Sequence, residues 1–189
     1  MTRAKLTDEF MRIAKEMLNS SNTLKNKLPL SNWVEDDLKS YINLAKTDFN
    51  DALADCESPI EQALALAFIH SGIHYFTHFT DRKIELVITK QATLNACGNK
   101  YRTDFLISVF YKTRKGNILK MFAIECDGHD YHEKTKKQVA YNNQRERDLK
   151  AAGYEVVRFS GSEIYKDARG CVQDLMKIIF NEYIRLECE

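Results

Sequence analysis

Two carboxylates stand one residue apart in the segment ECDGHDYH, which spans residues 125–132. Side chains alternate between the two faces of a β-strand, so Glu125 and Asp127 should point the same way while Cys126 points into the opposite layer. Without compensation the two acids would repel each other, raise one pKa and destabilise the fold. A bound divalent cation removes this conflict, and the pair therefore indicates a metal site.

A third acid, Asp104, stands just before the apolar run Phe105–Ile107. An acid at the head of an apolar strand is costly unless it is exposed, paired or a ligand. A hairpin between this strand and the next would bring Asp104 beside Glu125 and Asp127, and a set of oxygen ligands suits Mg²⁺ or Mn²⁺. The alternative is that all three acids lie on an open sheet edge in water.

Polar residues with other chemistry follow the acid pair. His129 and His132 could act as general acid or base beside a hard metal ion, with His132 preferred; ordinary loop histidines are the alternative. Further along, Gln138, Asn142 and Arg145 share one face of an expected helix. Such donors could face a phosphate, and a solvated helix surface would have the same pattern.

A sheet and its helices must position these residues. Ser58-Pro59-Ile60-Glu61 predicts a helix start, in which Glu61 either only favours the helix dipole or, as a fourth acid, holds a water ligand of the metal. Strands are expected over 74–79, 84–89, 101–111, 119–126 and 154–159, with helices over 132–152 and 162–187 and a hairpin turn at 112–117. This order predicts an α/β (mixed α+β) fold, a central mixed sheet flanked by helices.

The N-terminal part of the chain differs in character from the rest. Residues 4–18 and 33–54 have the apolar spacing of helices, and neither segment carries residues suited to chemistry. We therefore expect an N-terminal helical extension over 1–56 and a core over 57–189. The extension could bind a second copy of the chain or a protein partner.

Composition excludes several classes of protein. The 28 basic and 27 acidic side chains nearly cancel, but residues 82–120 hold nine basic and two acidic side chains, whereas residues 31–62 hold eight acidic and two basic ones. This split fits a basic face that meets phosphates, or lysine-rich strand edges that block aggregation.

The five cysteines lack zinc-ligand spacing, no secretory leader is apparent and no apolar run could cross a membrane. We expect a cytoplasmic protein with reduced thiols and no membrane role.

The combined pattern resembles the PD-(D/E)XK nuclease superfamily, and more narrowly its very-short-patch-repair-endonuclease-like branch. The matching features are an acid in one strand (Asp104), E-x-D-G at 125–128 with a downstream histidine, and L-x-x-x-G-Y-x-V-x-R-F at 149–159. They lie within residues 58–172. The resemblance implies a restriction-endonuclease-like fold, hydrolysis of phosphodiester bonds in DNA, and Mg²⁺ or Mn²⁺ as cofactor.

The resemblance also implies roles for single residues. Asp104 and Glu125 would ligate the metal, with Asp127 and Glu61 completing its shell. Asp127 departs from the family pattern, because many relatives have at this position a lysine that orients the attacking water and neutralises charge at the phosphate. Its work would pass to His132, His129 or Gln138. The residues expected to contact nucleic acid are Lys100, Arg102, Lys134, Asn142 and Arg145.

Two other functions remain open at this point. Asn142 and Asn143 stand where relatives often have Asp and Lys, which together with Asp127 favours a DNA-binding module on the same fold that does not cut. The other candidate function is that of a subunit of a defence complex, which binds its protein partner through the N-terminal helices. Arg158, in the last strand, is either functional or structural, pairing with a buried carboxylate.

Overall fold

The computed structural model describes residues 50–51, 53–73, 76–79, 83–128 and 136–188. The chain divides into two units, Met1–Ala54 and Asp55–Glu189, close to the predicted boundary. Most of the first unit, with the expected helices over 4–18 and 33–54, lies outside the described residues, so the domain division stays a prediction. The second unit contains every element described below.

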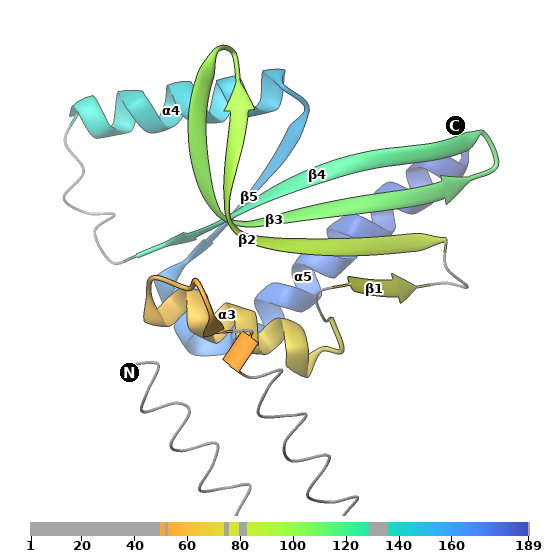
Figure 1. Ribbon diagram of the computed structural model, residues 1–189, viewed down its shortest axis with the longest axis horizontal. Helices are drawn as coiled ribbons and strands as arrows, with labels where there is room; N and C mark the ends of the chain where they lie inside the picture. The colour runs from red at the N-terminus through yellow and green to blue at the C-terminus, as the bar shows by residue number, and fades with distance from the viewer. Residues whose placement is uncertain (1–49, 52, 74–75, 80–82, 129–135, 189) are drawn as a thin grey trace, which may run out of the picture. The chain divides into compact units, whose positions relative to one another are not determined.

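The second unit consists of five strands and three helices in the described residues (Figure 1). Along the chain they are α3 (Pro59–His70), β1 (Phe76–Phe79), β2 (Ile84–Ala96), β3 (Asn99–Thr113), β4 (Gly116–Asp127), α4 (Lys136–Ala151), β5 (Tyr154–Ser160) and α5 (Gly161–Cys188). The strands lie in the order β1-β2-β3-β4-β5, antiparallel up to β4, and β5 runs parallel to β4 after the crossover through α4. The predicted fold class, a central mixed sheet flanked by helices as in restriction-endonuclease-like proteins, is confirmed.

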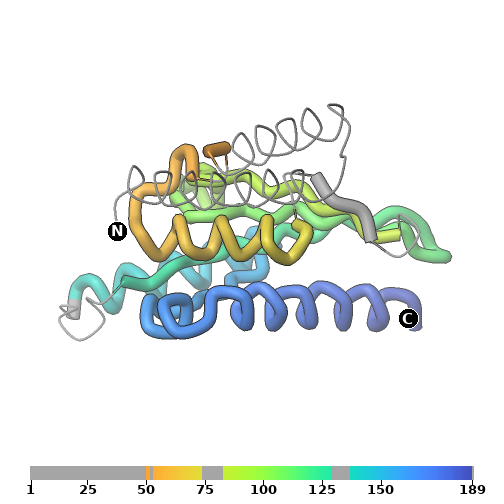
Figure 2. The backbone as a smooth tube through the Cα atoms, turned by 90° about the horizontal axis from the view of Figure 1, so that it is seen from below, coloured from red at the N-terminus to blue at the C-terminus, as the bar shows by residue number. Residues whose placement is uncertain are grey.

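One face of the sheet is covered by α3 and α5. The odd-numbered residues of β3 from Phe105 to Tyr111 are buried, as the strand period of two requires. Phe105 meets Phe68 of α3 edge-on at 5.6 Å, and Tyr111 donates a hydrogen bond of 3.0 Å to the Ile179 carbonyl of α5. Figure 2 shows α5 running along the sheet with α3 beside it. This layer holds the main core.

The hairpin of β2 and β3 is longer and more bent than predicted. The predicted end of β2 at Thr89 is wrong, because the strand continues to Ala96 and turns into β3 at Asn99. Gln91 has a positive φ of 49°, which interrupts the ladder between the pairs Lys90↔Phe105 and Ala92↔Thr103. The strands bend there, and the far end of the hairpin lies beside α4 (Figure 1). A second, smaller core forms here from Ala92, Leu94, Ala96, Tyr101, Ala123 and Leu149.

Candidate active site

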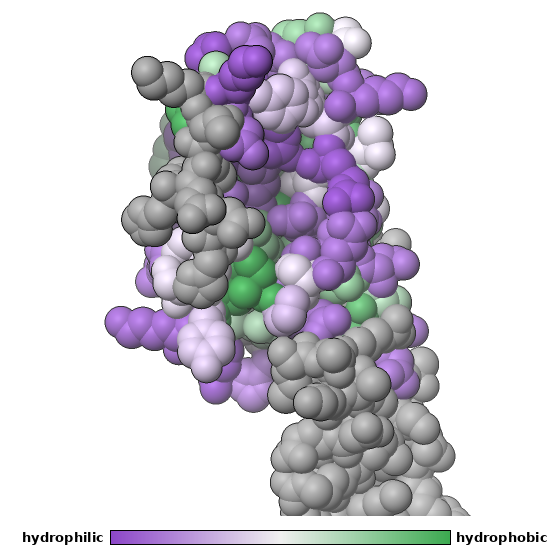
Figure 3. All heavy atoms as spheres, turned by 90° about the vertical axis from the view of Figure 1, so that its left-hand side faces the viewer, coloured by the Kyte–Doolittle hydropathy of each residue, from purple (hydrophilic) through white to green (hydrophobic). Residues whose placement is uncertain are grey.

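The bend of the β2–β3 hairpin leaves a pocket between β3, β4 and α4. Its volume is about 330 Å³. Pairing of β3 with β4 ends at Phe105↔Ile124, so the strands diverge beyond this point. Figure 3 shows the side of the molecule where β4 ends and α4 begins, on which hydrophilic side chains predominate. Among the described residues the pocket is lined by Arg102, Thr103, Asp104, Glu125, Asp127, Tyr141, Asn142 and Arg145.

Six of the residues predicted to form the site line this pocket. They are Asp104, Glu125, Asp127, Arg102, Asn142 and Arg145. Three other predicted residues are described but are not among its lining residues, namely Glu61, Lys100 and Gln138. The remaining three, His129, His132 and Lys134, lie outside the described residues, so their predicted roles are untested.

Asp104 lies beside β4, as the predicted hairpin requires. The Cys126 amide donates a hydrogen bond of 2.7 Å to its Oδ2. The pKa of Asp104 is raised to about 6: burial is the largest cause and the charges of Glu61 and Glu125 add to it, whereas the Cys126 amide and Arg145 act in the opposite direction. Burial and, to a lesser extent, the charges of the neighbouring acids therefore disfavour an ionised carboxylate at this position.

Glu125 is held between two arginines. Its side chain is buried, with 6% of the residue exposed. Arg145 Nη1 lies 2.5 Å from Oε1, and Arg158 Nε donates a hydrogen bond of 3.0 Å to Oε2. Arg158 also lies 3.0 Å from Glu146 Oε2 through its Nη1. Two guanidinium groups thus compensate the charge of one buried carboxylate. The pairing of Arg158 with Glu125 agrees with the structural role that the sequence analysis offered as one of two alternatives for Arg158.

Arg145 reaches the pocket from α4 and has three partners. Besides Glu125, its Nη2 donates a hydrogen bond to the Arg102 carbonyl oxygen on β3. Its guanidinium carbon lies 6.0 Å from the centroid of the Tyr101 ring, a distance at which a cation and an aromatic face attract each other. Arg145 therefore joins β3, β4 and α4 at one point.

Asp148 is a buried carboxylate that the sequence analysis missed. Its Oδ2 accepts hydrogen bonds from Tyr101 Oη at 2.6 Å and Asn99 Nδ2 at 3.2 Å, and its Oδ1 accepts one from Gln144 Nε2 at 2.6 Å. These bonds fix the far end of the β2–β3 hairpin to α4. Asp148 stands directly before the buried Leu149, and this position could have indicated that Asp148 is buried too. Because charged residues are rarely buried without partners, a buried Asp148 would then predict hydrogen-bond partners.

Glu61 is buried in a network of its own. Its carboxylate accepts hydrogen bonds from Ser58 Oγ at 2.6 Å, from the Glu57 amide at 2.8 Å and from Gln91 Nε2 at 2.7 Å. Ser58 Oγ in turn accepts from the Glu61 amide, so the predicted helix start is confirmed as a reciprocal cap. The same carboxylate holds Gln91 at the bend. Its role as a metal ligand stays a prediction.

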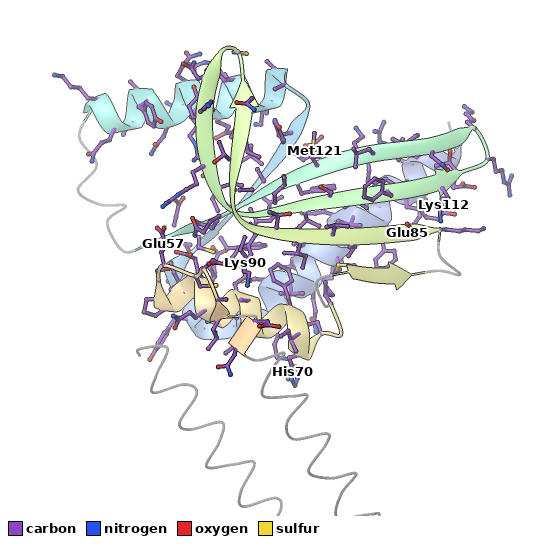
Figure 4. All side chains as sticks on the ribbon, viewed as in Figure 1. Glu57, His70, Glu85, Lys90, Lys112 and Met121 are labelled. Atoms are coloured by element: carbon purple, nitrogen blue, oxygen red, sulfur yellow. The ribbon has the colours of Figure 1, made fainter. Side chains whose placement is uncertain are left out.

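The exposed cations around the pocket are only loosely held. Arg102 donates to both carboxylate oxygens of Glu57, at 2.8 and 2.6 Å, and both side chains are more than half exposed. Such a pair contributes little stability, so a phosphate could replace Glu57. Figure 4 shows Glu57 at the start of α3, far from the Glu85–Lys112 ion pair at the opposite end of the sheet. Lys100 is exposed near the turn of the hairpin.

The donor chemistry of the pocket fits a hard divalent cation, but the arrangement of one donor does not. Asp104, Glu125 and Asp127 offer carboxylate oxygens, the ligands that Mg²⁺ and Mn²⁺ prefer. Both oxygens of Glu125, however, contact arginine. In the described part of the chain no three His, Cys, Asp or Glu residues form a group that could hold a metal. Burial strongly raises the pKa of the Cys126 thiol, which disfavours a thiolate ligand.

Comparison with known proteins agrees with this geometry. Residues 92–179 match the family model REase_MTES_1575, which describes a restriction-endonuclease-like family. This segment covers 88 of the 189 residues and includes all the pocket residues. Comparisons with curated proteins and with solved structures found no match. Among the described helices, none is long and apolar enough to cross a membrane. Over the segment that builds the pocket, the chain is similar to restriction-endonuclease-like nucleases.

Proposed function

We propose that this protein is a cytoplasmic, metal-dependent endonuclease that hydrolyses phosphodiester bonds in DNA, in repair, restriction or defence. The observation that carries the proposal is the pocket, in which three carboxylates and two arginines meet at the end of β4. The match of residues 92–179 to a restriction-endonuclease-like family supports it. The narrower likeness to very-short-patch-repair endonucleases rests on the E-x-D-G segment at 125–128 and the histidines that follow it.

The carboxylates and arginines of the pocket have separate tasks in this proposal. Asp104, Glu125 and Asp127 would hold Mg²⁺ or Mn²⁺, which lowers the pKa of bound water and polarises a phosphoryl group. Arg102 and Arg145 bind phosphate, because a planar guanidinium matches the oxygens of a phosphate with two parallel hydrogen bonds.

Several predicted residues keep proposed roles outside the pocket lining or beyond the described residues. His132, with His129 as the alternate, transfers the proton. Lys100, Lys134 and Gln138, together with Asn142 of the pocket lining, contact the nucleic acid, and Glu61 would hold a water ligand of the metal. A second copy of the chain or a protein partner binds through residues 1–56, which light scattering of the full chain and of the chain lacking these residues would test.

Cleavage assays test the proposed reaction. Purified protein is incubated with supercoiled and linear double-stranded DNA, single-stranded DNA and RNA, with Mg²⁺, Mn²⁺ or EDTA. We expect metal-dependent cutting of DNA that Asp104→Asn abolishes. Glu155→Gln, which alters an exposed acid of β5 away from the pocket, should cut as the wild type does. Absence of cleavage with either metal would refute the enzyme proposal.

Two observations favour a second candidate, a DNA-binding module that does not cut. Both oxygens of Glu125 contact arginine, and Asp127 replaces the lysine of the related nucleases. Binding of labelled DNA separates the two functions. A nuclease changed by Asp104→Asn loses cleavage while binding DNA, whereas a binding module binds DNA with no cleavage in either form.

A further inference from the structure

The contact between Arg145 and Glu125 bears on how the pocket takes up its metal, and the inference drawn from it rests on the proposed function. Glu125 Oε1 lies 2.5 Å from Arg145 Nη1. Metal–oxygen bonds of Mg²⁺ are about 2.0–2.1 Å long and need an oxygen lone pair directed at the ion. A guanidinium nitrogen this close competes for the same oxygen. We propose that Arg145 is an internal cation that takes the place of the metal at Glu125, and that metal binding displaces it toward the phosphate of the DNA.

Of the two arginines on Glu125, the structure favours Arg145 as the one that moves. Arg158 lies on β5 directly beside Glu125 in the parallel ladder and is also tied to Glu146. Its position follows from the sheet. Arg145 instead extends from α4, lines the pocket and keeps two other partners, the Arg102 carbonyl and the Tyr101 ring. These partners can keep its guanidinium in the pocket after it leaves Glu125.

The exchange couples metal binding to DNA binding. A phosphate in the pocket attracts Arg145, and this weakens its hold on Glu125. By thermodynamic linkage, whatever loosens Arg145 from Glu125 strengthens metal binding, and metal at Glu125 strengthens phosphate binding by the same factor. Without DNA the arginine keeps the buried carboxylate compensated. The metal is therefore bound more tightly when substrate is present.

The test measures Mn²⁺ affinity without DNA, by calorimetry or by electron paramagnetic resonance, in the full-length chain. Arg145→Gln removes the competing cation and should tighten Mn²⁺ binding about tenfold, within the usual range for coupled sites. Arg147→Gln is the matched control, because it removes one positive charge from the same helix at an exposed residue whose guanidinium bonds Gln144. It should leave the affinity within about twofold of the wild type. Arg145→Lys keeps the charge and should also stay close to the wild type.

Equal or weaker Mn²⁺ binding by Arg145→Gln than by the wild type would overturn the proposed exchange. If the wild type still cuts DNA with Mn²⁺, only the exchange fails and the nuclease proposal stands. If no form binds Mn²⁺ and none cuts, both fail. A measurement on the wild type avoids dependence on a folded variant: the Nε–H resonance of Arg145 should shift when Mg²⁺ is added, and an unchanged resonance would also overturn the exchange.

Discussion

Replacing Asp104 by Asn should stabilise the metal-free protein at neutral pH while removing its proposed activity. Burial is the main cause that raises the pKa of Asp104 from 3.8 to about 6, and Glu61 and Glu125 add to it. Because the folded-state pKa is above the unfolded one, the folded state binds the proton more tightly. Stability contributed by the protonated form is complete below about pH 4 and is lost as pH rises through 6.

The size of the effect follows from the shift. A difference of about two pKa units corresponds to roughly 3 kcal/mol at about 1.4 kcal/mol per unit. Asp104 is only partly buried, so solvent screening reduces this to about 1–2 kcal/mol. An asparagine carries no charge, and its amide oxygen can still accept the hydrogen bond from the Cys126 amide.

Urea denaturation in EDTA at pH 8, 6 and 4 measures this effect. Asp104→Asn should be more stable than the wild type at pH 8, by a margin that shrinks toward pH 4. Asp148→Asn is the control of opposite sign, because the hydrogen bond from Tyr101 lowers the pKa of Asp148. This second variant should lose stability at pH 8. Destabilisation by Asp104→Asn at pH 8, or a gain that does not change with pH, would refute the reasoning.

Three other changes test the remaining parts of the structure. Arg102→Ala breaks only an exposed ion pair with Glu57, so the free energy of unfolding should change by less than about 0.5 kcal/mol. DNA affinity should fall, and the slope of its logarithm against the logarithm of salt concentration should decrease by about one unit. An unchanged slope would show that Arg102 does not contact a phosphate. Tyr111→Phe removes the buried bond to the Ile179 carbonyl and should cost about 1 kcal/mol in urea denaturation without changing metal affinity. Chelation by EDTA should leave the thermal midpoint nearly unchanged, because two arginines compensate Glu125; a large fall would show that the fold depends on metal.

Much of the fold could be predicted from local pattern. The alternation along residues 101–111 predicts a strand with one buried face, and the structure has it. The cap at Ser58 also follows from four consecutive residues. The bend at Gln91 could not be predicted in this way. Its positive φ is unusual for glutamine, and its side chain donates a hydrogen bond to Glu61, thirty residues away in the chain.

The residue types of the site could be predicted from the sequence, but the ion pairs between its arginines and carboxylates could not. Strand alternation and a hairpin suffice to gather Asp104, Glu125 and Asp127, and the pocket contains all three. The contacts that Arg145 and Arg158 make with Glu125 come from a helix and a parallel strand further along the chain. Which cation meets which carboxylate depends on the crossover and on the tilt of α4, and no short-range pattern specifies either.

In the proposed nuclease, the arginines of the pocket would neutralise charge at the phosphate although Asp127 stands in place of a lysine. In the PD-(D/E)XK pattern that the sequence resembles, the lysine stands on the strand with the acids, whereas in this chain Arg145 and Arg102 line the pocket from α4 and β3. Arginine cannot give up its proton in a protein, so in the proposed nuclease these two residues would supply the electrostatic part of the lysine's role but not the proton transfer. A group that titrates near neutral pH must then accept the proton. His129 and His132 follow Asp127 by two and five residues, which is why the proposal assigns that role to them.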